Sequence, residues 1–294
     1  MKRAMILAAG LGTRLRPYSE LRPKPLFPVV GQPLLTRTIA ALRAASFSPV
    51  VVNAHHLGGQ IAAVLASARD IILQEEEAIL GTGGGLRKAL PYFGPEPVLV
   101  TNGDIFHTID FEQVYRAHLA SGATVTMVLH DEPRFNKVVV TANNAVAGFG
   151  DGDDPLLRRL AFTGIHVIDP AVLSLMPADT FYDIIDCYRS LLKQGAVINA
   201  LVVSGHFWTD MGTPEDYLAL HGVLLGGRVK GLPPPASPFH VGPGTVLGER
   251  LQMKEWAAIG AGARIGDDVS LERVVVWDGA IVPSGSQLID TIVT

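Results

Sequence analysis

The chain has 294 residues, of which 48% are hydrophobic and 18% charged, and its formal net charge at pH 7 is -4. This composition is typical of a well-packed α/β protein and excludes a disordered one. A nucleic-acid surface is not expected, because no basic run offsets the negative charge. The sequence has neither an apolar run long enough to cross a membrane nor a signal-peptide core, and its single cysteine, Cys187, permits no internal disulfide. We therefore expect a cytoplasmic protein that does not bind membranes, with Cys187 as a small buried hydrophobe.

Strand-like and helix-like segments alternate from residue 3 to about residue 225. The expected strands are 4–8, 50–53, 70–73, 97–101, 124–129 and 161–168, and the expected helices are 33–46, 57–67, 83–90 and 110–121. Apolar strands that alternate with helices predict a mostly parallel, doubly wound (Rossmann-like) sheet with helices on both faces. Ligands of such sheets bind beyond the carboxyl ends of the strands.

The first expected strand runs into a glycine loop, I-L-A-A-G-L-G-T-R-L-R-P at residues 6–17. Its two glycines allow a tight turn that presents backbone N–H groups to an anion. Arg14 adds a fork of donors, and Lys24 lies between two prolines that stiffen its segment. The Walker-type string is absent, and Leu15 stands where a dinucleotide fingerprint needs its third glycine. The loop is therefore a candidate phosphate site of another kind.

Two acidic residues follow strand-like or turn segments later in the chain. The string T-N-G-D at residues 101–104 ends a buried strand with Asp104, which would bring a hard oxygen ligand suited to Mg²⁺ to the sheet edge. An aspartate there is more often a turn former. The string W-T-D-M-G-T-P-E at residues 208–215 supplies a second acid, Asp210, and Thr213 then reads as a helix N-cap.

The string L-G-T-G-G-G-L at residues 80–86 places three consecutive glycines at the start of a helix. The conformational entropy that these glycines lose on folding is tolerable where a ligand must approach the backbone closely. The three glutamates at residues 75–77 are expected to be, for the most part, a solvated charge run.

Composition changes near residue 226, where paired glycines and then three prolines at residues 233–235 predict a stiff linker. Beyond it apolar residues recur every six positions, with one slip of a residue. They are Val241, Leu247, Met253, Ile259, Ile265, Leu271, Val276, Val282 and Leu288. Hexad periodicity predicts a parallel β-helix. We expect an α/β domain at 1–226, a proline-rich linker at 227–239 and a hexapeptide-repeat β-helix at 240–294.

Taken together, these strings resemble the sugar-1-phosphate nucleotidyltransferases, whose opening pattern is close to L-A-A-G-x-G-T-R-L-x-P with P-K-P about ten residues later. The resemblance implies Mg²⁺-dependent transfer of a nucleotidyl group from UTP or GTP to a sugar 1-phosphate by the domain at 1–226. It implies catalytic roles for Arg14, Lys24, Asp104 and Asp210, with Mg²⁺ on the two aspartates. The nucleotide-binding residues that it implies are Leu7, Ala8, Ala9, Gly10, Gly12, Thr13, Arg14, Lys24, Gly81, Thr82, Asn102 and Gly103.

Two features bear on the substrate. The triple-glycine string resembles the corresponding segment of N-acetylmuramate 1-phosphate uridylyltransferases and of heptose- or mannose-1-phosphate guanylyltransferases. The string F-T-G-I at residues 162–165 resembles the segment near the sugar in these enzymes. This second resemblance implies that Thr163 and Gly164 contact the sugar. The E-K-P string that contacts the sugar phosphate in many members is missing. Nothing in the sequence chooses among four substitutes, Arg134, Lys137, Arg158 and Arg159. The missing lysine favours a uridylyltransferase, whereas the hexads favour a mannose-type enzyme. The sequence therefore does not decide which nucleobase the nucleoside triphosphate carries.

Some family members carry a left-handed β-helix tail, which here is expected to cap the protein or to join copies into a homo-oligomer. Hexads also occur in acyltransferases, but His240 is the only histidine in this segment that could act as a base. Two other functions remain as alternatives: a cytidylyltransferase acting on a phospho-alcohol, and a non-catalytic nucleotide-sugar-binding regulatory subunit. The presence of all four charged candidates speaks against the regulatory subunit.

Overall fold

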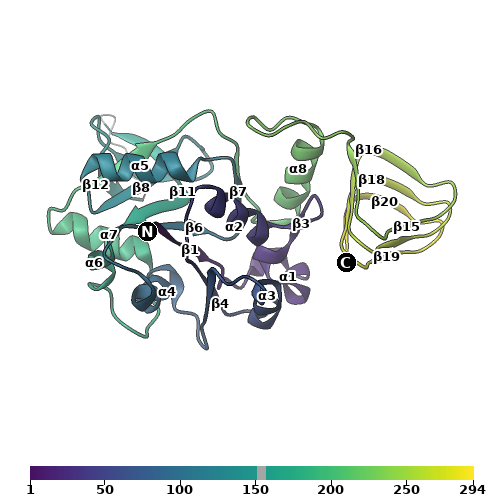
Figure 1. Ribbon diagram of the computed structural model, residues 1–294. Coiled ribbons are helices and arrows are strands. Elements are labelled where there is room, and N and C mark those ends of the chain that lie inside the picture. Colours follow the sequence, from purple (N-terminus) through teal and green to yellow (C-terminus); the bar gives the residue numbers. More distant parts are fainter. Residues whose placement is uncertain (151–156) are drawn as a thin grey trace. The chain divides into compact units, whose positions relative to one another are not determined.

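The computed structural model describes residues 1–150 and 157–294 (Figure 1). Contacts divide the chain into two compact units. The first consists of Met1–Leu11, Thr38–Gly103 and Ile109–Gly205. The second consists of Gly12–Arg37, Asp104–Thr108 and His206–Thr294. Each unit therefore draws on segments that are distant in the sequence.

The first unit contains a nine-stranded sheet, and one side of this sheet is parallel. Its strands are in the order β6-β1-β4-β5, with bounds β6 (Val98–Asn102), β1 (Arg3–Leu7), β4 (Val50–Ala54) and β5 (Ile71–Glu75). Every residue of β4 is buried, so both faces of the sheet are covered there. The predicted α/β fold with a mostly parallel central sheet and helices is confirmed, and these four strands lie within two residues of their predicted bounds.

The other side of the sheet is built around a long antiparallel strand, β11 (Arg158–Ile168), which pairs with β6, β8 and β9. Its remaining members are β8 (Val125–His130), β9 (Asn136–Val140), β10 (Val146–Phe149) and β12 (Ile198–Val202). The direction of β11 could not be predicted, because an apolar run has the same pattern in either direction.

The helices of the first unit are α3 (Gly58–Leu65), α4 (Gly81–Ala89), α5 (Phe111–Ser121), α6 (Pro170–Leu173) and α7 (Ile184–Lys193), with a 3-10 turn η3 (Leu90–Tyr92) and most of α2 (Leu34–Ala44). Of these, α4, α6 and α7 pack with the sheet in a core that includes Met5, Leu86 and Tyr188. Cys187 is buried in the same core, as expected, and burial raises the pKa of its thiol to about 11. No helix of the described residues is long and apolar enough to span a membrane.

The second unit begins with short elements that surround a cluster of aromatic side chains. These elements are η1 (Thr13–Leu15), α1 (Tyr18–Leu21), η2 (Lys24–Leu26), β2 (Pro28–Val29), β3 (Gln32–Pro33), β7 (Ile105–His107), β13 (Trp208–Asp210) and α8 (Pro214–Leu225). Thr213 caps α8 by accepting a hydrogen bond of 3.2 Å from the Asp216 N–H, so the predicted N-cap is confirmed. Phe27 packs edge-on against Trp277 with ring centroids 4.8 Å apart. This core joins the N-terminal segment, α8 and the C-terminal strands.

The C-terminal strands stack in parallel (Figure 1). One ladder contains β14 (Phe239–Val241), β16 (Gln252–Ile259), β18 (Ser270–Val276) and β20 (Gln287–Val293), and the other contains β15 (Val246–Leu247), β17 (Arg264–Ile265) and β19 (Ile281–Val282). The register aligns Leu247 with Ile265 and Val282, so every third apolar hexad position falls in the same column. A Cβ at Gly248 would lie 2.4 Å from the backbone of Gly266, which explains why glycine follows this hexad position.

Candidate functional site

The four charged candidates, Arg14, Lys24, Asp104 and Asp210, come together within the second unit. The Nζ of Lys24 donates hydrogen bonds to Asp104 Oδ2 at 2.7 Å and to Asp210 Oδ1 at 3.0 Å. Arg14 Nη2 donates to Asp210 Oδ2 at 3.2 Å. Lys24 is only 6% exposed, which a lysine tolerates when its charge is paired. The cluster is formally neutral, with two cations and two anions.

A pair of short strands sets the two aspartates side by side. β7 and β13 are antiparallel, and the register places Asp210 opposite Ile105, the residue that follows Asp104. Lys24 opens the 3-10 turn η2, and the prolines on either side of it restrict the backbone. The cluster thus rests on regular backbone pairing rather than on long flexible loops.

Two glycines, Gly12 and Gly212, make room for this cluster, and only Gly12 was among the predicted site residues. A Cβ at Gly212 would lie 2.6 Å from Arg14 Nη1 and 2.7 Å from Asp210 Oδ2, so any side chain there would displace the ion pair. Gly12 has φ +62°, a conformation that favours glycine. The D-x-G spacing was the signal that could have identified Gly212 as part of the site.

The donor set fits a small hard cation. Asp104 and Asp210 share one ammonium group, so their carboxylates lie within reach of a common ion. Among the described residues, no group of three or more histidine, cysteine, aspartate or glutamate side chains could hold a metal. Mg²⁺ is commonly bound by one or two carboxylates, with water and substrate phosphates completing its octahedron. Two carboxylates and no further protein ligand agree with that pattern.

The beginning of the glycine loop lies at the carboxyl edge of the sheet in the first unit. The register pairs Leu7 with Asn102, and the Gly103 N–H donates to the Leu7 carbonyl at 2.8 Å. A Cβ at Gly103 would lie 3.0 Å from that carbonyl oxygen. The Ala8 N–H donates to Asn53 Oδ1 at 2.7 Å. Four of the predicted nucleotide-binding residues (Leu7, Ala8, Asn102 and Gly103) are therefore adjacent.

The loop continues through Ala9 and Gly10 into η1 of the second unit. Ala9 is 9% exposed, whereas Gly10 is exposed and a Cβ built on it would meet no atom within 4 Å. Thr13 is also exposed, at the start of η1. The backbone at Gly10 therefore has open space on its side-chain face.

Sequence reasoning missed a buried polar network beside this loop. Asn53, Gln74 and Glu76 are each 2–4% exposed. Glu76 Oε1 accepts from Asn53 Nδ2 at 2.8 Å and from Gln74 Nε2 at 3.3 Å, and Oε2 accepts from the Leu80 N–H at 3.3 Å. The predicted solvated run holds for Glu75 and Glu77, which are exposed, and is wrong for Glu76. The sequence did contain a signal for this network, because Asn53 and Gln74 are polar residues near the ends of the strands that become β4 and β5.

The triple glycine is explained by packing inside the protein. The N–H groups of Gly83 and Gly84 both donate to the Tyr182 carbonyl, at 2.8 and 3.1 Å. A Cβ at Gly84 would lie 2.5 Å from the Thr180 carbonyl oxygen, and one at Gly85 would lie 2.9 Å from Asn53 Nδ2. The close approach that these glycines permit is therefore that of residues 180–182 and the Asn53 network.

The two predicted nucleobase residues stand at the start of α4, directly before these glycines. Gly81 has φ +70°, which accounts for glycine at this position. The Thr82 hydroxyl accepts a hydrogen bond of 2.9 Å from the Ile184 N–H. The backbone here is held by the segment that leads into α7.

The predicted sugar-side residues lie on β11. Thr163 is fully buried, and its hydroxyl donates to the Val128 carbonyl at 2.8 Å. Gly164 has φ +79° and lies where the β8–β11 register shifts between Phe162 and His166. Backbone conformation therefore explains glycine at 164.

The basic residues considered for the sugar phosphate make local contacts. Arg158 donates to Asn144 Oδ1, Arg159 donates to the Gly150 carbonyl, and the Arg134 guanidinium stacks 5.0 Å from the centroid of its neighbour's ring, Phe135. Lys137 lies in β9. Their geometry does not single out one of them.

Comparisons with known proteins decide the family. The Nucleotidyl transferase family matches residues 3–225. The chain belongs to this nucleotidyl transferase family. A mannose-1-phosphate guanylyltransferase of Mycobacterium tuberculosis is 28% identical over 96% of this chain and 81% of its own length. An N-acetylmuramate alpha-1-phosphate uridylyltransferase of Neisseria meningitidis serogroup B is 30% identical over 72% of this chain and 93% of its own. The family predicted from the motifs is thereby confirmed.

A solved structure supports the fold of this nucleotidyl transferase. The crystal structure of a putative glucose-1-phosphate thymidylyltransferase from Bacillus anthracis superposes with a TM-score of 0.65 at 21% identity. The match covers 75% of this chain and 94% of that structure. At this identity the likeness establishes the shared α/β fold.

Proposed function

We propose that the protein transfers a nucleotidyl group from UTP or GTP to a sugar 1-phosphate, releasing pyrophosphate and forming a nucleotide sugar. The observation that carries this proposal is the convergence of Lys24 and Arg14 on Asp104 and Asp210. The names of the related guanylyl- and uridylyltransferases supply the substrate classes.

Lys24 and Arg14 supply positive charge to the phosphates. Attack of a sugar phosphate oxygen on the α-phosphorus is opposed by repulsion between two anions, and fixed cations lower that barrier. The Arg14 side chain is 58% exposed, and its guanidinium has donors beyond the one used on Asp210. Asp210 accepts from both cations and so orients them. No covalent intermediate on the protein is required.

Asp104 and Asp210 would hold Mg²⁺. The ion, when bound, would screen phosphate charge and hold the reacting groups in line. Asp104 is suited to such a ligand because its side chain is 36% exposed, whereas Asp210, at 14%, also serves the two cations.

The backbone of the glycine loop is the nucleotide-binding element of this proposal. Leu7–Gly10, Asn102 and Gly103 would present main-chain groups at the sheet edge, and Gly12 and Thr13 would continue the phosphate loop. Gly81 and Thr82 would contact the nucleobase. Thr163 and Gly164 would contact the sugar through the backbone, since the Thr163 hydroxyl is bonded within the protein.

We further infer a catalytic domain at 1–226, a linker at 227–239 and a left-handed parallel β-helix at 240–294 that caps the protein or joins copies of it. The family match, which ends at residue 225, supports the first boundary. The β-helix is supported by columns of hexad positions in register, such as Val241, Ile259 and Val276.

An assay of pyrophosphate release tests the proposal. UTP and GTP are crossed with the 1-phosphates of N-acetylmuramate, mannose, glucose and heptose in the presence of Mg²⁺. Release with one pair identifies the base and the sugar. If folded protein that binds a nucleotide sugar releases no pyrophosphate with any pair, the proposal is overturned in favour of a regulatory role.

A further inference from the structure

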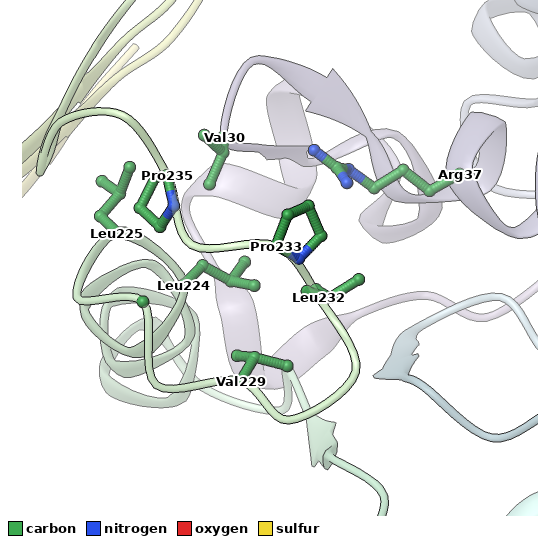
Figure 2. A pocket seen from close by; sticks show the side chains of 9 residues that line it. Val30, Arg37, Leu224, Leu225, Val229, Leu232, Pro233 and Pro235 are labelled. Atoms are coloured by element: carbon green, nitrogen blue, oxygen red, sulfur yellow. The ribbon is translucent and has the colours of Figure 1, made fainter.

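A small pocket of about 130 Å³ lies within the second unit (Figure 2). Its walls come from the β2–β3 turn, α2, the end of α8 and the chain that follows α8. Eight of its nine lining residues are valine, leucine, proline or glycine, and the ninth is Arg37. Figure 2 shows the Arg37 guanidinium extending toward Val30 and Pro233. The pocket is therefore apolar with one cationic wall.

The charge of Arg37 has no counter-ion among the described residues. Its Nε is buried and has no hydrogen-bond partner. The titratable groups that face it are His221 and His240. Burial lowers the pKa of both histidines, and the positive charge of Arg37 lowers it further. His221 gives no acceptor, because its Nε2 accepts from the Val30 N–H at 3.1 Å and its Nδ1 lies 2.9 Å from the Tyr217 carbonyl. Burial in turn lowers the pKa of Arg37.

An anion is the ligand that this arrangement lacks. Leaving a partly buried guanidinium unpaired is costly, and its planar fork matches the two oxygens of a carboxylate. A phosphate would bring further oxygens that the apolar side chains could not satisfy. A pocket of about 130 Å³ has the volume of about four water molecules at roughly 30 Å³ each, which suits a short-chain carboxylate and is too small for a nucleotide.

We propose that this pocket binds a short-chain aliphatic carboxylate, with its carboxylate on Arg37 and its hydrocarbon against Leu224, Val229 and Pro233. The site is made entirely of residues outside the charged cluster of Arg14, Lys24, Asp104 and Asp210. Its occupancy therefore does not depend on the nucleotidyl transfer proposed above.

Saturation-transfer NMR with butyrate and the full chain tests the site without an activity readout. The wild-type protein should transfer saturation to the butyrate methyl and methylene protons. Arg37→Met should abolish the transfer, whereas Arg43→Met on the same helix, which removes an exposed guanidinium paired with Asp70, should retain it. No transfer to wild type, or full transfer to Arg37→Met, would overturn the proposal.

Two further measurements complete the test. Leu232→Trp fills the pocket while Arg37 stays, and it should also abolish the butyrate signal; Leu232 is 40% exposed, so the larger side chain can be accommodated. Inorganic phosphate added as competitor should leave the butyrate signal within twofold of its starting value. Displacement of butyrate by phosphate at lower concentration would overturn the assignment of a carboxylate.

Discussion

Asp104 and Asp210 share the ammonium group of Lys24, at 2.7 and 3.0 Å. The β7–β13 pairing brings these two like charges together, and the shared cation offsets their repulsion. The arrangement gives the second unit two carboxylates and two cations in one place, which is the chemical inventory that phosphoryl transfer requires.

The first prediction concerns the role of Asp210. Asp210→Asn should lower turnover at least about a hundredfold, because a preorganised charged group is lost from the proposed reacting centre. The measurement is steady-state pyrophosphate release. Asp186→Asn is the matched control, since Asp186 is exposed on α7 and forms an ion pair with the exposed Arg189 on the same helix. Turnover of Asp210→Asn equal to that of the control, from folded protein, would remove Asp210 from the site.

The second prediction concerns the buried carboxylate. Glu76→Gln should lower the free energy of unfolding by about 1–3 kcal/mol. The carboxylate accepts hydrogen bonds on both oxygens, whereas the amide replaces one of these acceptors with an NH₂ group, which would then face another donor. The exposed Glu77→Gln should change the free energy of unfolding by less than about 0.5 kcal/mol. Urea unfolding of the two variants measures the difference. Equal stabilities would show that the network around Glu76 does not hold the segment.

The third prediction separates packing from ligand approach at the triple glycine. Gly84→Ala should lower the free energy of unfolding by about 1–3 kcal/mol, because its Cβ would lie 2.5 Å from the Thr180 carbonyl oxygen. Gly59→Ala on α3 has open space and should raise it by about 0.5–1 kcal/mol. Thermal and urea unfolding provide the comparison without substrate. An unchanged stability in Gly84→Ala would return this glycine to a role in binding.

The fourth prediction concerns acid sensitivity. Burial lowers the pKa of His221 to about 4 and that of His166 to about 3. The unfolded chain takes up these protons near pH 6.5, so the unfolded state binds more protons and the free energy of unfolding falls as the pH drops from about 6.5 to 4. Each histidine contributes a slope of up to about 1.4 kcal/mol per pH unit in this range.

Urea unfolding between pH 7.5 and 4.5 measures that slope. His166→Leu should reduce it, since both ring nitrogens of His166 are buried without partners and leucine removes the titration. A slope in His166→Leu as steep as in the wild-type protein, or a stability that rises on acidification, would contradict the assignment.

Much of the first unit and the charged cluster could be predicted from the sequence. Strands such as β4 and β6 are continuous apolar runs, and the predicted ends lie within one residue of the observed ones. Asp104 and Asp210 stood beside glycines in strand-end or turn strings, and Lys24 stood between two prolines. Local patterns identify such positions because burial and turn formation are local properties.

What could not be predicted depends on contacts between distant segments. Glu76 stands between two exposed glutamates, and the hydrogen bonds that it accepts from Asn53, Gln74 and the Leu80 N–H distinguish it from them. The glycines at 83–85 are required by residues 180–184 and by Asn53, about 100 and 30 positions away. The pocket at Arg37 likewise arises from the β2–β3 turn and the segment after α8. Sequence patterns carry no record of such pairings.

The most direct test of the proposed reaction follows the α-phosphate. GTP or UTP labelled with ³²P at the α-position is incubated with each sugar 1-phosphate, Mg²⁺ and the wild-type protein, and the products are separated. We expect the label to pass into a nucleotide sugar while the released pyrophosphate is unlabelled. Label that stays in the nucleoside triphosphate, or appears only in free nucleoside diphosphate, would contradict nucleotidyl transfer.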